Sequence, residues 1–193
     1  MALSSEEVLA IFEQKGAYLR GHFRLTSGLH SGEYLQCARV LEFPDTAEKL
    51  GSEIADHIED QIDVVVSPAI GGLIVGYEVA RALEARFLFT ERDPATRHMS
   101  LRRGFELREG ERALVVEDVV TTGGSSVEVI DILLAAGVHV AGAASIIDRS
   151  GGKANLGVQR IALATLNPVT WTEPQCPLCR EGAPLTKPGS RPA

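Results

Sequence analysis

The feature that most constrains the fold is a regular alternation of short apolar runs with helix-like segments between residues 63 and 165. Apolar residues at helical spacing fill segments such as 73–83 and 127–136. Strands that are apolar on both faces and alternate with helices are typical of a mainly parallel sheet covered by helices. We therefore expect an α/β fold with a five-stranded, mainly parallel sheet. Its predicted strands are 63–67, 86–90, 112–117, 138–147 and 160–165.

The two ends of the chain depart from this alternation. Residues 1–43 begin with a capped amphipathic helix that ends at Gly16 and continue as short strands and turns. Residues 168–193 contain six prolines, so we expect an irregular tail. We predict a single domain over residues 1–193, with its core at about 44–167.

Composition narrows the class of protein. The 193 residues are 45% hydrophobic, enough for a proper core, and 26 acidic against 19 basic residues give a net charge of −7. An acidic balance argues against a surface that coats nucleic acid, which needs clustered positive charge. The chain starts without the pattern of a signal peptide, and no apolar stretch is long enough to span a bilayer. We expect a cytoplasmic protein with no nucleic-acid or membrane partner.

The strongest candidate site is the segment 115–126, where an apolar strand runs into Glu117 and Asp118 and is followed by hydroxyls and a glycine pair. Glycines let backbone N–H groups approach a phosphate, and the N-terminus of the next helix adds a positive dipole. Two carboxylates beside a phosphate should face something else: sugar hydroxyls, a Mg²⁺-linked group or a developing cationic carbon. The alternative is an acidic strand end that caps its own helix.

This segment resembles the 5-phosphoribosyl 1-diphosphate (PRPP) signature of the type I phosphoribosyltransferases. Further matches at 25–34, 68–72, 102–105 and 148–149 make the chain similar to the orotate phosphoribosyltransferase family over roughly residues 15–190. The resemblance implies the type I phosphoribosyltransferase fold, with a small hood formed by the N-terminal region and the tail. It also implies an enzyme of pyrimidine (UMP) biosynthesis that uses Mg²⁺ carried by PRPP. Such an enzyme transfers the phosphoribosyl group to N1 of orotate, giving orotidine 5′-monophosphate and pyrophosphate.

The resemblance assigns roles to individual residues. Glu117 and Asp118 would bind the ribose hydroxyls and act in catalysis, and Thr121 and Arg149 would contact orotate. An arginine at the end of a strand can grip a planar carboxylate with two hydrogen bonds; the alternative for Arg149 is an ordinary salt bridge with Asp148 or Asp131. The loop 68–72 is either a diphosphate site or only a tight turn. The complete PRPP site would comprise Ala69, Gly71, Gly72, Glu117, Asp118, Val119, Val120, Thr121, Thr122, Gly123, Gly124 and Ser125.

The segment 91–104 gathers positive charge in an acidic chain. It is either a solvated face or a mobile lid that closes over the diphosphate and excludes water. The resemblance implies a homodimer in which this lid, residues 92–104, is shared with the neighbouring subunit. Many relatives carry catalytic lysines here, but this chain has none between Lys49 and Lys153. The candidates for those roles are Arg92, Arg97 and His98.

Cys176-Pro-Leu-Cys179 suggests zinc, but a structural zinc needs four ligands, only Cys37 remains, and no histidine lies near in the sequence. The Pro-rich surroundings also argue against a redox motif. We therefore expect no metal held directly by the protein. We expect His30 to be a polar surface residue, and Ser27, Ser31 and Tyr34 to lie in the hood over the base.

Two other functions share parts of this pattern. A purine phosphoribosyltransferase has the same PRPP signature, but Arg149 and the segment 102–105 argue against it, because a purine base has no carboxylate. A PRPP-sensing transcriptional regulator should show a basic face or an added helix-turn-helix region. Neither is visible in the sequence.

Overall fold

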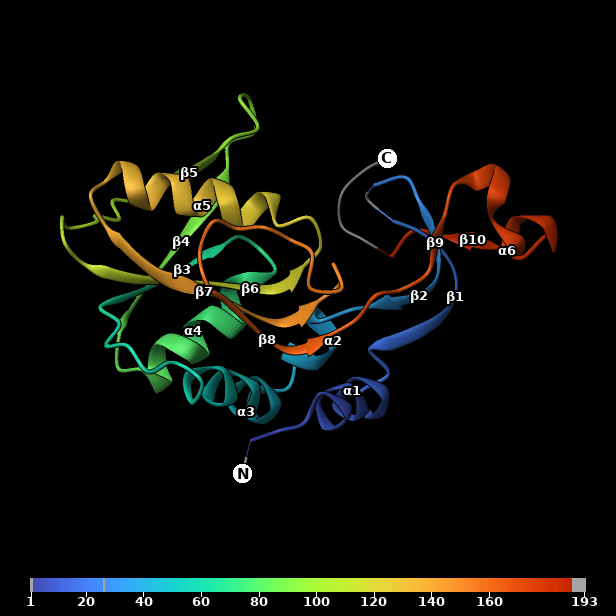
Figure 1. Cartoon of the computed structure of the whole chain (residues 1–193), viewed down its shortest axis with the longest axis horizontal. Coiled ribbons are helices and arrows are strands. Elements are labelled where there is room, and N and C mark those ends of the chain that lie inside the picture. Colours follow the sequence, from blue (N-terminus) through green and yellow to red (C-terminus); the bar gives the residue numbers. More distant parts are fainter. Residues whose placement is uncertain (1, 26, 189–193) are drawn as a thin grey trace.

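The computed structural model describes residues 2–25 and 27–188 and contains two sheets (Figure 1). The large sheet has the strand order β5-β4-β3-β6-β7-β8, and the small sheet has the order β10-β1-β2-β9. The strands of the large sheet are β3 (Val64–Pro68), β4 (Arg86–Arg92), β5 (Met99–Leu101), β6 (Arg112–Val120), β7 (His139–Asp148) and β8 (Arg160–Thr165). Those of the small sheet are β1 (Tyr18–Arg24), β2 (His30–Leu35), β9 (Thr170–Trp171) and β10 (Leu185–Thr186). The helices are α1 (Ser5–Gln14), α2 (Ala38–Leu41), α3 (Pro44–Ala55), α4 (Gly72–Ala82), α5 (Gly124–Ala135) and α6 (Pro177–Arg180), with a 3₁₀ turn at Glu173–Gln175.

The large sheet confirms the predicted α/β class. Its strands β4, β3, β6, β7 and β8 pair in parallel, as the five apolar runs predicted. The sixth strand, β5, was not predicted and pairs antiparallel with β4. It has only three residues and lies in the polar segment 91–104, so it carries no periodic apolar signal.

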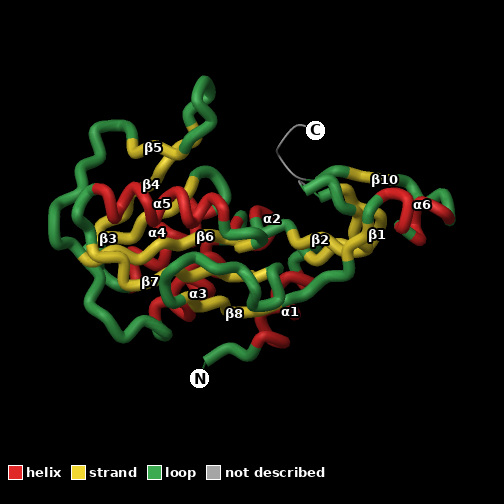
Figure 2. The backbone as a smooth tube through the Cα atoms, turned by 45° about the horizontal axis from the view of Figure 1, so that its top comes forward, coloured by secondary structure: helices red, strands yellow, loops and turns green. Residues whose placement is uncertain are grey.

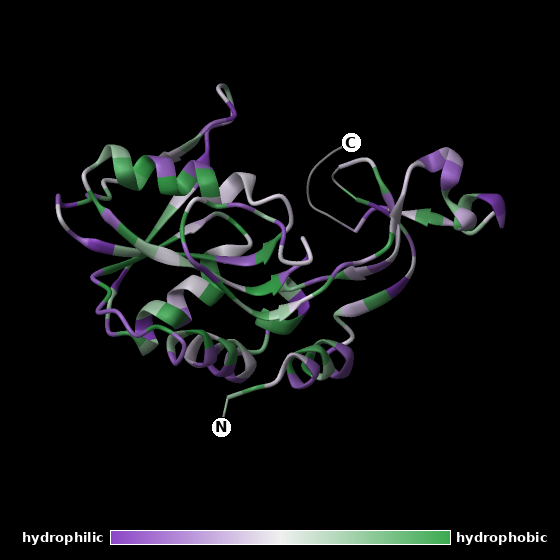
Figure 3. Cartoon of the chain, in the orientation of Figure 1, coloured by the Kyte–Doolittle hydropathy of each residue, from purple (hydrophilic) through white to green (hydrophobic). Residues whose placement is uncertain are grey.

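Successive side chains of a strand point to opposite faces of the large sheet, so the core is divided into two clusters. Val65 packs in a cluster with apolar side chains of α1, α3 and α4, whereas Val64 and Val66 pack with those of α5. Figure 1 shows α5 on one side of the large sheet and α3 and α4 on the other. Green, hydrophobic stretches lie on several strands of this sheet, while helices such as α3 show both hydrophobic and hydrophilic stretches (Figure 3). Strands buried on both faces are therefore largely apolar, while the covering helix α3 is amphipathic.

Local signals set where the helices begin. The side chain of Ser4 accepts a hydrogen bond from the backbone of Glu7, whose own side chain bonds back to Ser4, so a capping box starts α1. Helix α3 starts at Pro44, because proline suits the first helical position, and it ends at Ala55.

The small sheet joins the two ends of the chain and forms the hood, which we define as β1, β2 and residues 168–188. We expected an irregular tail, but its short strands pair with the N-terminal hairpin, β10 beside β1 and β9 beside β2. Figure 1 shows this red tail against the blue N-terminal strands. Two-residue strands have too short a pattern for the sequence to reveal them. Within the described ranges, no helix is long and apolar enough to cross a membrane.

Candidate active site

The acidic pair and the glycine loop lie together at the carboxyl end of β6. Glu117 and Asp118 are its last polar residues, and α5 begins at Gly124 after an exposed loop. Gly123 has φ +81°, and a Cβ there would come within 2.3 Å of Leu156 Cδ2, so only glycine fits. The N-cap residue of α5, Gly123, makes no side-chain cap hydrogen bond, and the positive N-terminus of the helix faces the loop. This arrangement suits a phosphate.

The loop 68–72 lies directly against the acidic pair. A Cβ on Gly71 would come within 2.5 Å of Asp118 Oδ1, and one on Gly72 within 2.9 Å of the Val116 carbonyl oxygen. The glycines therefore serve a close approach to β6 and not merely a turn. Ala69 donates its N–H to the carbonyl of Thr90 at 2.8 Å, and the Ala69–Ile70 peptide bond is cis. This loop and the acidic pair line one corner of the sheet edge.

The two carboxylates have different surroundings. Burial raises the pKa of Asp118, so the charged form lacks full solvation. Glu117 accepts a hydrogen bond from the hydroxyl of Ser126 in the first turn of α5. That bond joins the acidic end of the strand to the first turn of the helix through side chains. Hydroxyl donors or a cation near Asp118 would stabilise its charged form.

The valines of the signature play a packing role. Val120 is buried, and Val119 packs against the core cluster below the sheet. Because both side chains pack into the protein, a ligand at this edge would contact these two residues through their backbone. Thr121 and Thr122 are exposed, and Ser125 is half-buried.

Arg149 follows β7 at the same edge. Its N–H donates to the Val120 carbonyl at 2.8 Å, and its guanidinium lies 5.8 Å from the ring centroid of Tyr34 on β2. Burial lowers the pKa of Arg149. The suggested partner Asp148 instead pairs with Arg160 at 2.5 Å, and no ion pair links Arg149 to an acid anywhere in residues 2–25 and 27–188. A half-buried guanidinium of this kind can donate two hydrogen bonds to the carboxylate of a ligand.

The charged segment 91–104 forms a hairpin of β4 and β5 that rises away from the body of the molecule (Figures 1 and 2). Arg92 makes two hydrogen bonds, of 2.9 and 3.1 Å, to Glu128 on α5, a partner that no sequence pattern indicates. Helical spacing on α5 cannot predict the Arg92–Glu128 contact, because the two residues are 36 positions apart in the sequence. Arg97 and His98 are exposed in the connection between the two strands. The predicted lid residues thus divide into one tethered arginine and two exposed groups.

The hood supplies one side chain to this edge and corrects two expectations. Tyr34 faces Arg149, whereas Ser31 is buried and donates to the Val169 carbonyl at 3.3 Å. The prediction that His30 is a surface residue is wrong: its exposed fraction is 1%. The expectation that only Cys37 remains to join Cys176 and Cys179 is also wrong, because Cys176 Sγ lies 3.4 Å from Nε2 of His22, which is 154 residues away in sequence. Only tertiary folding could reveal that contact.

Comparison with known proteins agrees with this geometry. The phosphoribosyl transferase domain model matches residues 38–156. Over 190 residues, 98% of this chain, the sequence is 52% identical to orotate phosphoribosyltransferases from Desulforamulus reducens and Pelotomaculum thermopropionicum, and the match covers 98% and 99% of those proteins. The fold is similar to the crystal structure of orotate phosphoribosyltransferase from Aeropyrum pernix. That comparison has a TM-score of 0.69 and 28% identity, and it covers 82% of this chain and 93% of that one.

Proposed function

Because the chain belongs to the phosphoribosyltransferase family, we infer that it acts as an orotate phosphoribosyltransferase in pyrimidine biosynthesis. It transfers the phosphoribosyl group of PRPP to N1 of orotate, releasing pyrophosphate and orotidine 5′-monophosphate. The observation that carries the choice of base is Arg149, a half-buried guanidinium that forms no ion pair with an acid in the described part of the chain. The carboxylate of orotate can accept hydrogen bonds from this guanidinium, whereas a purine base has no carboxylate.

The PRPP site follows from the two glycine loops. The exposed loop of Thr121 and Thr122 and the N-terminus of α5 hold the 5′-phosphate through N–H groups and hydroxyls. Gly71 and Gly72 bring the N-terminus of α4 beside the acidic pair, which suits the diphosphate. The carboxylates of Glu117 and Asp118 then accept hydrogen bonds from the ribose hydroxyls.

Catalysis is mainly electrostatic. Carbon 1 of the ribose becomes cationic as the diphosphate leaves, and N1 of orotate attacks its opposite face with inversion. Asp118 and Glu117 favour that positive charge through the ribose hydroxyls. Mg²⁺ enters with PRPP as part of the substrate and neutralises the leaving diphosphate, and carboxylate oxygens are donors that suit it. The chain itself orients both reactants and limits the access of water.

We assign the lid role to the β4–β5 hairpin in a homodimer. Its exposed Arg97 and His98 bring positive charge that can reach the diphosphate of a neighbouring subunit. Arg92 is a candidate for the same role once its bonds to Glu128 open. The position of the hairpin away from its own body supports this proposal (Figure 2). We place the enzyme in the cytoplasm, where its small polar substrates are available.

The test is the ultraviolet absorbance of orotate with the full chain, PRPP and Mg²⁺. We expect a decline that requires both PRPP and Mg²⁺ and is accompanied by pyrophosphate. Adenine and hypoxanthine in place of orotate are the matched controls. Pyrophosphate release with a purine, and none with orotate, would contradict the assignment of the base while retaining the PRPP site.

A further inference from the structure

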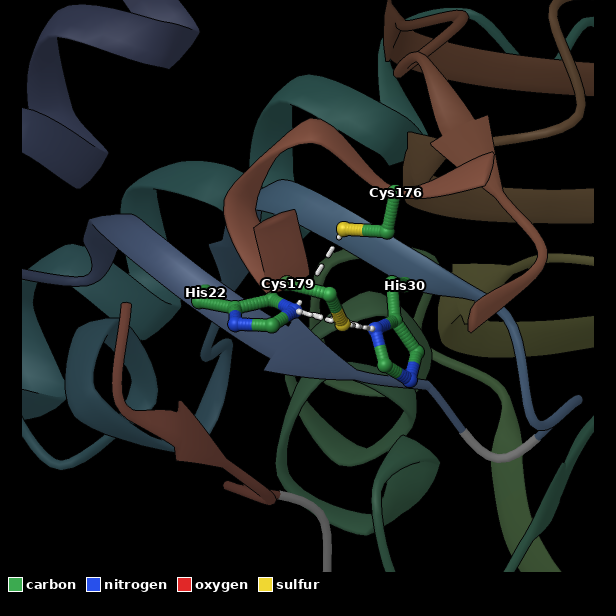
Figure 4. A group of neighbouring side chains, drawn as sticks. All are labelled: His22, His30, Cys176 and Cys179. Atoms are coloured by element: carbon green, nitrogen blue, oxygen red, sulfur yellow. Dashed lines mark hydrogen bonds between the residues drawn. The ribbon is translucent and has the colours of Figure 1, made fainter. Parts of the chain in front are cut away.

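Four side chains that the proposed reaction does not use converge inside the hood. They are His22 on β1, His30 at the start of β2, and Cys176 and Cys179 at the ends of the CxxC segment around α6. Their donor atoms all lie within 4.8 Å of one another, and the first three residues are buried. Figure 4 shows the four side chains directed at one another from two strands and the tail. We propose that they form a structural zinc site.

The distances fit a tetrahedral ion. Zinc bonds of about 2.3 Å to sulfur and about 2.0–2.1 Å to nitrogen separate tetrahedral ligand atoms by about 3.3–3.8 Å. In the hood, Cys176 Sγ and Cys179 Sγ lie 3.4 and 3.6 Å from His22 Nε2. Cys179 Sγ lies 3.2 Å from His30 Nδ1, and the two ring nitrogens are 2.9 Å apart. Small outward shifts of the imidazoles complete the coordination.

A second contact orients one ligand. The other ring nitrogen of His22, Nδ1, lies 2.9 Å from the carbonyl oxygen of Ala183. A proton on Nδ1, donated to this carbonyl, leaves the lone pair of Nε2 directed at the two sulfurs. Histidines that bind metals commonly donate their second N–H in this way, which fixes tautomer and ring orientation.

The backbone of β1 places His22 for this role. His22 and Phe23 are both buried although they are consecutive, and the pairing of β1 with β2 shifts register between Arg20 and Phe23. In a regular strand, successive side chains point to opposite faces, whereas a bulge re-aims one of them. The irregularity turns an imidazole inward next to His30.

Charge and packing favour zinc over an empty polar cluster. The charges of two thiolates and two neutral imidazoles balance that of Zn²⁺, so the occupied site carries no net charge and tolerates burial. Neither apolar core cluster of the described residues includes a side chain from 169–188. The tail therefore lacks core packing, and a metal that joins it to β1 and β2 supplies the missing anchorage. Four protein ligands leave no open position, which is the pattern of a structural site, and two cysteines with two histidines are a common ligand set of structural zinc.

The first test uses the unmodified full chain, purified without chelators. We expect about one zinc per chain by elemental mass spectrometry, and X-ray absorption at the zinc edge should show two sulfur and two nitrogen ligands. Protein without zinc, or with zinc in an oxygen-dominated shell, would overturn the proposal. So would iron in place of zinc, or an intact mass two hydrogens lower that reveals a Cys176–Cys179 disulfide.

Matched variants then assign the ligands. Cys179→Ser and His22→Gln should each weaken zinc binding more than the roughly 10–100-fold that loss of a supporting partner costs. Cys37→Ala and His139→Gln remove the same residue types outside the cluster and should keep zinc. Unchanged zinc binding in the first two variants would overturn the assignment. If they fail to fold, the wild-type absorption spectrum still decides, and because zinc content is measured without turnover, it is independent of the proposed reaction.

Discussion

The large sheet and the hood bury their strands with different chemistry. In the large sheet, Val64, Val65 and Val66 are all buried, and apolar helices cover both faces. In the hood, the buried positions of β1 and β2 include His22, His30 and Ser31. The first region gains stability mainly from apolar area removed from water. The second depends on specific polar contacts between segments far apart in the sequence.

This difference also separates two kinds of functional group. The residues proposed to bind PRPP follow apolar strands, so the rigid sheet edge positions them. The group proposed to face the base, Arg149 with Tyr34 beside it, lies where the sheet edge meets the hood. Changes in the acidic pair at the sheet edge, which we call the core site, should therefore affect catalysis of the phosphoribosyl transfer. Changes at Arg149 and Tyr34, which we call the junction, should affect recognition of orotate.

The largest expected effect is on the core site. Asp118→Asn keeps the shape of the side chain but removes the charge that stabilises the cationic ribose. We expect kcat to fall about 10²–10³-fold, as for the loss of one preorganised electrostatic group. The melting temperature should not fall, because burial disfavours the charged carboxylate in the native state. Asp131→Asn on exposed α5 surface is the control. Unchanged kcat in Asp118→Asn would remove this acid from the mechanism.

The second effect is on stability and compares packing in the two regions directly. Leu133 on α5 is fully buried, so Leu133→Ala should cost about 2–5 kcal/mol. Leu185 on β10 is 45% exposed, and Leu185→Ala should cost less than about 1 kcal/mol. Urea unfolding of the full chain measures both. Equal losses would mean that the tail packs as the core does, which would break the comparison.

The third effect concerns the junction. Arg149→Ala removes charged hydrogen bonds to the orotate carboxylate, worth about 1.5–3 kcal/mol, so KM for orotate should rise roughly 10–100-fold. KM for PRPP should change much less. Arg149→Lys keeps the charge but loses the planar fork, and should recover only part of the loss. Equal increases in both KM values would instead indicate a structural role for Arg149.

Sequence patterns predicted the large sheet and its helices, because their structure depends on local periodicity. Five parallel strands, their helices and the signature loop follow from apolar patterns and glycine positions. The hood could not be predicted in this way, since β10 has two residues and pairs with a strand more than 150 positions earlier. His30 was misplaced for the same reason: its burial depends on the tail. Glu128 was missed because a surface glutamate on a helix has no pattern that identifies its partner.

The smallest expected effect contrasts two aspartates on neighbouring strands of the large sheet. Burial raises the pKa of Asp118. Burial also acts on Asp148, but hydrogen bonds from Ser150 and the Arg160 guanidinium outweigh it and lower its pKa. Asp148 therefore contributes stability above its unfolded pKa that is lost as pH falls through its folded pKa. Asp118 has the opposite sign: the native state binds its proton more tightly, so stability is lost as pH rises through its folded pKa.

Urea unfolding across the acidic range can separate the two contributions. Asp148→Asn should be less stable than the wild type at neutral pH, with a difference that shrinks as pH falls through the range in which Asp148 titrates. Asp118→Asn should show the reverse, a gain at neutral pH that shrinks on acidification, because the amide has no charge to desolvate. The same sign for both variants would contradict these assignments. Opposite signs would show that a single sheet edge holds one carboxylate for its structure, through Arg160, and keeps the other at a cost to stability.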